Sequence, residues 1–430
     1  MSIYNYEEAF GTWDKTGKTM RAAIEDWFSL YYQSGATEQS DPCQRIAYTV
    51  VNKIVKTAFG EYRAFSEDPA AQAVLGKLDE KRKEAVQLAL IGGECYLKPC
   101  PGAEGFTFTL VPRNNVLIFG RNADGEPTDI GTVEKSTAGK YYYTLLERRS
   151  VDAQGFLTIE NQLFRSLSSQ SLGTRIPLQN HPAYAHLPEK HRYPVALHCV
   201  GLVRLKTPTV NCVDGSADGV AVYAAAAGLI RNIDRNEAQM NGEFSRGESR
   251  VIVSADMLGK DGLQEHLFVG LDEDPERVGM TVYSPQLRER SFLARKQEYL
   301  RNVESIIGLK RGMLSDANVE ERTATEITSS AGDFNLTVID FQNMWEEAVR
   351  KTIILCDKLA QLYRLPRVVD QDFNIDWGNG ILYDEERTWE DYKSMVAAGL
   401  LKPEIALAWR FNIPAGTEAE LAAVRKKYMP

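Results

Sequence analysis

The stretch GTWDKTGKT, residues 11–19, is the part of the sequence that comes nearest to a nucleotide-binding motif. A phosphate-binding loop has the pattern GxxxxGK[ST], in which backbone N–H groups and the lysine hold the phosphates. Gly11 stands one residue too far from the GKT at 17–19 to complete it. The preceding IYNYEEAF has little β character, and no later apolar strand ends in an acid suited to magnesium. We therefore interpret residues 11–19 as a loop between two N-terminal helices.

Four of the five histidines lie in one segment and are candidate zinc ligands. They are His181, His186, His191 and His198, the last followed by Cys199. Histidine and cysteine are common zinc ligands. Their spacings of five, five and seven residues suit neither one helix face nor a compact knuckle, and prolines interrupt the segment. We expect surface or packing roles for these histidines and no bound metal.

Other candidate motifs have plainer interpretations. DGSADG, residues 214–219, could hold an anion before a helix, but without the rest of a nucleotide fold it predicts a turn and a helix cap. The acidic clusters at 272–274 and 320–321 fall in predicted loops, where carboxylates are usually solvated. No nucleophile elbow is present, and no histidine pairs convincingly with a reactive serine or cysteine. The sequence therefore predicts neither an enzyme nor a cofactor.

The composition is that of a soluble globular protein: 430 residues, 43% of them hydrophobic and 25% charged, enough for two or three domains. The net charge of −9 argues against a protein that grips nucleic acid over a wide basic surface. It is compatible with one that lets DNA slide past. No apolar run reaches the roughly 18–20 residues that span a bilayer, and the first residues do not form a secretory signal. We expect no membrane association.

The six cysteines predict no disulfide framework, because none forms a CxxC pair. We expect buried free thiols and synthesis in a reducing cytoplasm. The cysteines are Cys43, Cys95, Cys100, Cys199, Cys212 and Cys356.

The first half of the chain changes its hydrophobic period near residue 93. Residues 1–92 predict helices, which we place at 19–32, at 41–60 with Pro42 at its start, and at 78–93 with two glycines at its end. From 94 to 165, short β-rich segments alternate with turn signals, which predicts an antiparallel sheet. Residues 166–213 are rich in proline and are predicted to be irregular.

The second half begins with a helix at 216–245, capped by Ser216 or Asp218, with an apolar stripe from Val222 to Phe244. Strand-like pieces follow at 249–254, 265–271 and 279–285. A second helix covers about 288–307, with an apolar face of Leu293, Leu300, Val303 and Ile307.

A polar stretch then separates this helix from a very long one. Gly308 suits the C′ position of the helix before it, and Thr323 with Glu326 forms a capping box for the helix after it. The apolar stripe of the long helix runs to a stop at Pro366, roughly 60 Å for about forty residues. The tail predicts one strand, FNIDWG, and three helices that begin near Thr388, Pro403 and Thr417.

In this order of elements the chain resembles the portal proteins of tailed bacteriophages, especially the shorter, siphophage-like kind. The segments that carry the resemblance are ADGVAVYAAAAGLIRNIDRNEAQMNGEF, NVESIIGLKRGML, ERTATEITSSAGDFNLTVIDFQNMWEEAVRKTI and FNIDWGNGILYDEERTWEDYKSMVAAGLLKPEIALA. The first 210 residues match mainly in the order of their elements. The resemblance implies an α+β portal fold with long helices around a ring channel, usually of about twelve subunits at one capsid vertex.

The resemblance also divides the chain into the regions of a portal subunit. These are a wing (1–215), a first stem helix (216–245), a clip (246–287), a second stem helix (288–307), a tunnel loop (308–322), a long wing helix (323–370) and a small helical crown (371–430). A tunnel loop points into a water-filled channel and has no core to join, so we expect it to be polar and mobile. The tail and the clip are both short for such a protein.

Two sets of residues would meet partners. In the tunnel loop, basic side chains would face DNA phosphates, and acidic side chains would keep the binding of DNA weak. The set is Lys310, Arg311, Asp316, Asn318, Glu320, Glu321 and Arg322. In the clip, the partner-binding set is Arg250, Val251, Val253, Phe268, Val282 and Tyr283. The implied partners are other copies in the ring, double-stranded DNA, terminase, the head–tail adaptor, the major capsid protein and the scaffolding protein. The implied location is the virion, after synthesis in the host cytoplasm.

Two alternatives stay open at this stage. One is another capsid-associated structural protein, such as a minor head protein or an adaptor, although adaptors are usually much shorter. The other is a nucleotide-binding enzyme, which would need the phosphate loop that residues 11–19 miss by one position.

Overall fold

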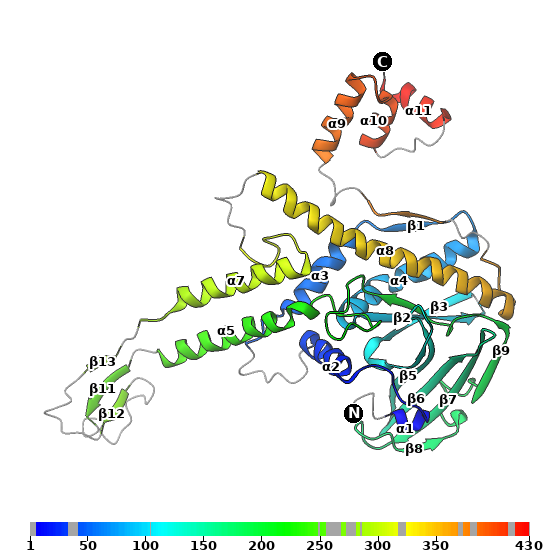
Figure 1. The fold of residues 1–430 in the computed structure, drawn as a ribbon, viewed down its shortest axis with the longest axis horizontal. Helices are drawn as coiled ribbons and strands as arrows, with labels where there is room; N and C mark the ends of the chain where they lie inside the picture. Colours follow the sequence, from blue (N-terminus) through cyan, green and yellow to red (C-terminus); the bar gives the residue numbers. More distant parts are fainter. Residues whose placement is uncertain are drawn as a thin grey trace. The chain divides into compact units, whose positions relative to one another are not determined.

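The computed structural model describes residues 6–32, 42–103, 105–247, 250–254, 268–271, 281–283, 286–316, 324–368, 373–378, 385–411 and 418–429. It combines helices with mainly antiparallel sheets, as an α+β chain does (Figure 1). The chain divides into two compact units, each described by itself below. The first contains Met1–Ala58 and Ala64–Asn374, and the second contains Phe59–Arg63 and Ile375–Pro430.

The first unit opens with four helices: α1 (Glu7–Phe10), α2 (Lys18–Tyr32), α3 (Ile46–Phe59) and α4 (Pro69–Gly92). Helix α4 begins well before the predicted residue 78, because the Asp68 carboxylate caps the N–H groups of Ala70 and Ala71. Its predicted end is confirmed by Gly93, whose φ of 80° is left-handed. Helix α3 does not begin at Pro42, since Arg45 has a φ of 54° that no helix can contain.

Two antiparallel sheets follow. The smaller has the order β10-β2-β3, with β2 at Glu94–Gly102, β3 at Gly105–Pro112 and β10 at Val203–Lys206. The larger has the order β4-β5-β6-β7-β8, with β9 also paired to β7. Its strands are β4 (Val116–Arg121), β5 (Pro127–Ala138), β6 (Tyr141–Val151), β7 (Phe156–Ser166), β8 (Thr174–Ile176) and β9 (Lys190–Ala196). The sheet predicted for 94–165 is thus confirmed, divided in two.

The prediction that 166–213 is irregular was wrong, because β8, β9 and β10 lie there. Proline was the misleading signal. Pro194 lies inside β9, between the paired residues Arg192 and Ala196, where the register with β7 shifts. A strand tolerates proline at such an irregularity because no ladder hydrogen bond is required there.

The core of the first unit consists of several apolar clusters against the sheets. One joins α1 to the larger sheet through Tyr6, Phe10, Leu117, Phe119, Val133, Leu146 and Phe164. A second lies between the two sheets, around Tyr96, Val116, Ile118 and Ile130. These clusters fix the body from which the second half of the chain extends.

Helices α5 (Ala227–Arg246) and α7 (Glu289–Ile307) lie side by side, and a small sheet of β11 (Arg250–Ser254), β12 (Phe268–Leu271) and β13 (Thr281–Tyr283) follows the far end of α5 (Figure 1). The three strands and the second helix were predicted and are confirmed. Helix α5 begins eleven residues later than predicted, after the short 3-10 helix η4 (Ala224–Ala226).

Helix α8 (Ala324–Tyr363) is the long helix that the stripe predicted, and it packs on α4, β2 and β10. Its buried face includes Val338, Phe341, Trp345, Val349 and Ile353, each at most 1% exposed. The predicted cap, Thr323, lies outside the described residues. No described helix is long and apolar enough to cross a membrane.

The second unit contains α9 (Glu385–Ala397), α10 (Pro403–Arg410) and α11 (Glu418–Tyr428). Strands β1 (Arg63–Phe65) and β14 (Asn374–Asp376) fall at the boundary of the units. Pro403 occupies the first turn of α10, as predicted. Thr388 does not begin a helix, because α9 already includes it; Thr417 lies outside the described residues. Within this unit, the Glu404–Arg425 ion pair joins α10 to α11.

Candidate functional site

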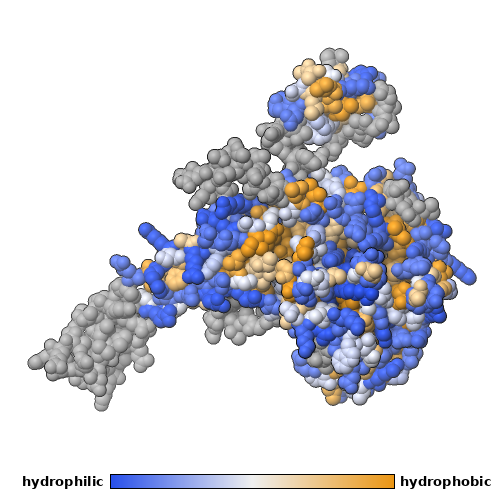
Figure 2. Space-filling model, viewed as in Figure 1, coloured by the Kyte–Doolittle hydropathy of each residue, from blue (hydrophilic) through white to orange (hydrophobic). Residues whose placement is uncertain are grey.

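The α5–α7 helix pair is held mainly by polar contacts along its outer part. The Asn236 side chain donates to the Phe292 carbonyl at 3.1 Å, and the Lys296 ammonium lies 3.0 Å from the Glu237 carboxylate. Arg288 pairs with Glu243 at 2.6 Å, although the arginine side chain is 74% exposed. Figure 2 shows hydrophilic residues along much of this pair. Exposed ion pairs contribute little stability, so the far end of the pair, at Arg288 and Glu243, is only weakly self-supporting.

Apolar burial in the pair is concentrated at its inner end. Ile230, Ile233, Leu300 and Val303 are buried there. The predicted stripes were wrong further out, since Phe244 and Leu293 are more than 40% exposed. The apolar stripes of α5 and α7 are therefore buried only in the inner halves of the two helices, because only those halves contact the body.

A buried carboxylate folds the chain back at the end of α7. Glu304, 1% exposed, accepts hydrogen bonds from the N–H groups of Gly312 (3.1 Å), Leu314 (2.5 Å) and Ser315 (2.9 Å), and from the Ser315 hydroxyl (2.8 Å). Gly308 ends α7 in the left-handed conformation, as predicted, with φ 77°. Leu309 is buried. The expectation of a polar loop with no core to join is therefore wrong for residues 308–316, because Glu304 and Leu309 hold them to the helix.

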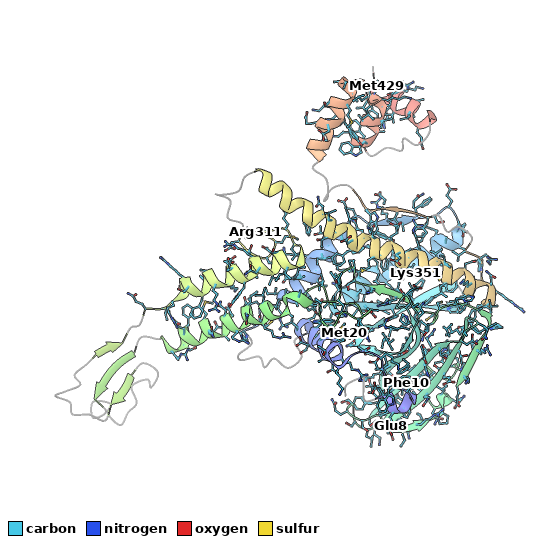
Figure 3. All side chains as sticks on the ribbon, in the orientation of Figure 1. Glu8, Phe10, Met20, Arg311, Lys351 and Met429 are labelled. Carbon is cyan, nitrogen blue, oxygen red and sulfur yellow. The ribbon has the colours of Figure 1, made fainter. Side chains whose placement is uncertain are left out.

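The charged residues of this loop point to solvent. Lys310 and Arg311 are exposed (Figure 3 labels Arg311), and neither forms an ion pair with a carboxylate that the structure describes. Asp316 is also exposed, and its N–H donates to the Gln297 side chain at 2.8 Å. The other predicted loop residues lie outside the described part of the chain: Asn318, Glu320, Glu321 and Arg322.

All six predicted clip residues fall in the β12-β11-β13 sheet. Val251 on β11 is opposite Phe268 on the parallel β12 and opposite Val282 on the antiparallel β13. Arg250 is opposite Tyr283, and Val253 also lies on β11. The structure thus brings these residues together through the backbone.

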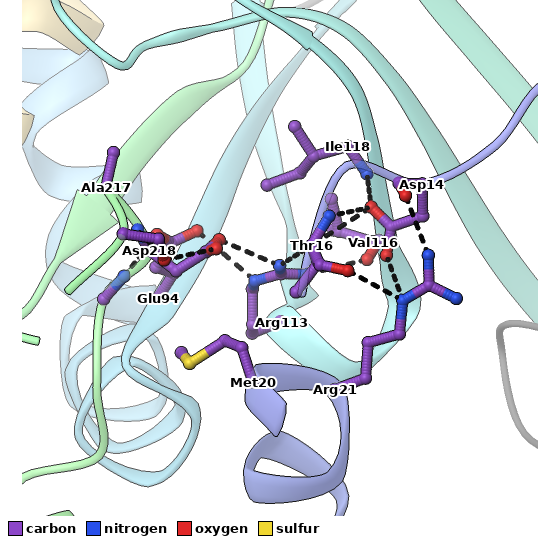
Figure 4. A network of polar contacts seen from close by, with 12 residues as sticks. Asp14, Thr16, Met20, Arg21, Glu94, Arg113, Val116, Ile118, Ala217 and Asp218 are labelled. Atoms are coloured by element: carbon purple, nitrogen blue, oxygen red, sulfur yellow. Dashed lines mark hydrogen bonds and ion pairs between the residues drawn. The ribbon is translucent and has the colours of Figure 1, made fainter. Parts of the chain in front are cut away.

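Sequence reasoning missed a buried joint between the body and the start of α5. Asp218 was predicted as a helix cap, but its carboxylate instead accepts from the Arg113 guanidinium at 3.1 Å (Figure 4). It also accepts from the Arg121 guanidinium at 2.6 Å. The carboxylate is therefore occupied, which explains why α5 does not begin beside it.

Glu94 is the second carboxylate of this joint. It accepts from the Gly219 N–H at 2.7 Å and from Arg204 at 2.5 Å, and it lies 3.6 Å from Arg113. Burial alone would raise the pKa of Glu94, but the charges of Arg204 and Arg113 outweigh it and lower that pKa to about 2. Glu94 is therefore ionised at neutral pH although it is fully buried.

Close backbone approach completes the joint. A Cβ atom on Gly93 would lie 2.3 Å from the Gly219 carbonyl group, so no side chain fits there. Thr207 donates its N–H to the Gly93 carbonyl at 3.0 Å and its hydroxyl to the Val220 carbonyl at 2.7 Å. The segment before α5 is thus bonded directly to the end of α4 and to β10.

Residues 11–17 form a loop between α1 and α2, as the sequence predicted, although Lys18 and Thr19 already belong to α2. Polar side chains of this loop contact the same network. Asp14 accepts from the Ile118 N–H at 2.8 Å, and Arg113 donates to the Thr16 hydroxyl at 2.8 Å (Figure 4). Burial raises the pKa of Asp14. These side chains are engaged in packing the N-terminal loop onto the sheet.

The histidines and cysteines are dispersed. His181 stacks near Tyr143 and Tyr184, and His191 contacts Tyr193. Among the described residues, no three histidine, cysteine or acidic side chains form a group that could hold a metal; His266 and the acids at 272–274 lie outside them. All six cysteines are free, but only Cys95 and Cys356 are buried and Cys212 is exposed, which corrects the expectation that the thiols are buried.

The comparisons with known proteins find likenesses among solved structures alone. No family model matches the chain, and no curated protein matches it. A solved structure described as "Neck of native GTA particle computed with C12 symmetry" is similar over 96% of this chain and 98% of that chain, with 13% identity and a TM-score of 0.48. A likeness of this size is too distant to support a function.

Proposed function

We propose that this chain is a portal subunit of a tailed-phage-like particle. The observation that supports it is the arrangement of α5, the β11–β13 sheet, α7, the Glu304-bound loop and α8. In this reading α5 and α7 are the stem, β11–β13 the clip, and α8 the long wing helix. The resemblance of the sequence to portals implies the same order.

The helix pair has the properties of a component that neighbours complete. Its outer part buries little apolar surface, while Leu293 and Ile306 on α7 and Leu336 and Ile339 on α8 are exposed, at 43%, 49%, 63% and 38%. Leu336 and Ile339 lie three residues apart and so share one face of α8, where an exposed apolar patch marks a contact surface. In a ring of about twelve copies, they would be covered by the adjacent subunits.

The exposed charges suit a channel that passes DNA without holding it. Lys310 and Arg311 have no described acidic partner and are free to meet phosphates. The net charge of −9 opposes tight, wide binding, which releases many counterions and would stall movement. We further propose that the ring docks terminase and later the head–tail adaptor, beside capsid and scaffolding proteins, in the virion, and that it has no catalytic activity of its own.

Native mass spectrometry with negative-stain imaging of the purified chain tests this proposal. We expect closed rings of about twelve copies with a central hole near the width of duplex DNA. A small closed dimer that buries residues 246–322 would overturn it, because those surfaces could then neither line a channel nor face an adaptor.

A further inference from the structure

The short segment at 42–45, just before α3, is bonded to both helices of the α5–α7 pair, and Figure 1 shows that α3 begins beside them. The Gln44 N–H donates to the Asp234 carboxylate of α5 at 2.8 Å. The Gln44 side-chain oxygen accepts from the Lys296 ammonium of α7 at 2.7 Å. One residue thus joins two helices that lie 190 and 252 positions away along the chain. We call residues 42–45 the strap.

The two helices stay paired through contacts that do not involve the strap. The Lys296 ammonium also lies 3.0 Å from the Glu237 carboxylate of α5, so its ion pair across the helices is separate from its bond to Gln44. The Asn236 side chain donates to the Phe292 carbonyl at 3.1 Å. Release of the strap would therefore leave α5 and α7 joined to each other and would remove their tie to the start of α3.

The strap is held in a strained conformation by contacts that water can reach. Arg45 has a φ of 54°, in the left-handed region that is unfavourable for residues other than glycine. Its N–H donates to the Cys43 sulfur, a weak acceptor, at 3.2 Å. Gln44 is half-buried, and the Lys296 side chain is 22% exposed. Water can replace such contacts at a lower cost than those of the fully buried joint.

We infer that the strap is a latch, which opens and closes over the α5–α7 pair while the body and the two helices stay folded. When it is closed, it ties the pair to the start of α3. When it is open, the apolar inner end of the pair and the joint before α5 hold the pair to the body. This inference concerns a single chain and does not depend on the proposed ring.

Cys43 provides a readout of opening, because it lies in the strap and is half-buried. Two other thiols serve as references in the same chain. Cys212 is exposed and reports the reactivity of the reagent, whereas Cys356 on α8 is buried and reports opening of the body. Alkylation of each thiol in the full-length chain is followed by mass spectrometry at constant pH. We expect Cys43 to react more slowly than Cys212 and much faster than Cys356.

Variants on both sides of the contact test whether it holds the strap closed. Gln44→Ala and Lys296→Met each remove the bond between the two side chains and should speed alkylation of Cys43 roughly tenfold, with Cys356 unchanged. Loss of a cation disfavours the thiolate, so a faster reaction in Lys296→Met reports exposure and not charge. The double variant should match Lys296→Met, because both changes remove the same bond. Arg288→Met breaks a contact at the far end of the same helix pair and should leave Cys43 unchanged.

Three results would overturn the inference. Cys43 could keep its parent rate in folded Gln44→Ala and Lys296→Met variants, which would mean that these bonds do not hold the strap closed. Cys356 could accelerate in step with Cys43, which would mean that the strap opens only when the whole chain unfolds. Arg288→Met could act as strongly as Lys296→Met, which would mean that Cys43 responds to any loosening of the helix pair.

Discussion

Ion pairs hold the segment before α5 and the far end of α5, but in different surroundings. Before the helix, Asp218 and Glu94 bind Arg113, Arg121 and Arg204 in the interior. At its far end, Glu243 binds Arg288 at a similar distance, 2.6 Å, with the arginine in solvent. Burial removes competing water and makes an unpaired charge costly, so the first set fixes the backbone while the second can open and close. An arginine–carboxylate pair thus makes a rigid joint where it is buried and a contact that can open where it is exposed.

The largest expected effect comes from removing the central cation of the joint. Arg113→Met leaves the buried carboxylates of Glu94 and Asp218 short of a partner, and we expect a loss of roughly 3–5 kcal/mol in the free energy of unfolding. Denaturant titration followed by circular dichroism measures it. Arg288→Met, at the far end of α5, is the matched control and should leave the midpoint unchanged. Equal effects of the two would contradict the contrast between buried and exposed pairs.

The backbone contact of the joint should be nearly as sensitive. Gly93→Ala places a Cβ against the Gly219 carbonyl group at a residue with φ 80°, and we expect a cost of roughly 2–3 kcal/mol. Gly76→Ala, inside helix α4, meets no atom within 4 Å and should stabilise the protein by up to about 1 kcal/mol. Thermal unfolding of both variants decides the point. A neutral Gly93→Ala would show that the α4 end and the segment before α5 can move apart.

The joint should also impose a pH dependence on stability. The pKa of Glu94 is lowered from 4.5 to about 2 in the folded chain, so its stabilisation is complete above pH 4.5 and is lost as the pH falls toward 2. Glu94→Gln, although less stable at neutral pH, should lose less stability across that window than the parent protein. Some slope remains because the pKa of Glu147 is also about 2. Unfolding free energies measured between pH 2 and 5 test this, with the exposed Glu80→Gln expected to retain the full slope.

The smallest expected effect is local and concerns the loop after α7. Glu304→Gln keeps one acceptor oxygen but removes the charge that receives the N–H groups of Gly312, Leu314 and Ser315. We expect about 1–2 kcal/mol less protection of these amides in hydrogen exchange, with little change in global unfolding. Glu298→Gln, on the exposed face of α7, is the control. Unchanged exchange at all three amides would mean that Leu309 alone holds the loop.

Local signals predicted most elements of this fold. The stripe of α8, the glycine at the end of α4, the glycine at the end of α7 and the proline at the start of α10 each depend on residues within a few positions. The joint gave no such signal, since Asp218 and Gly219 bond to residues 97–125 positions away. The portal regions themselves are predictions that the ring experiment must test.

Helix α5 can also be considered as a mechanical part. Its 20 residues form a lever about 30 Å long, which follows the clamped segment Ala217–Val220 and is loaded where β11 begins. A sideways force on the small sheet therefore exerts its greatest bending moment at the clamp, where the covalent chain is reinforced by buried charges. The exposed contacts near Arg288 and Glu243 give way first and absorb the displacement. The molecule is thus compliant at the tip of the lever and stiff at its base.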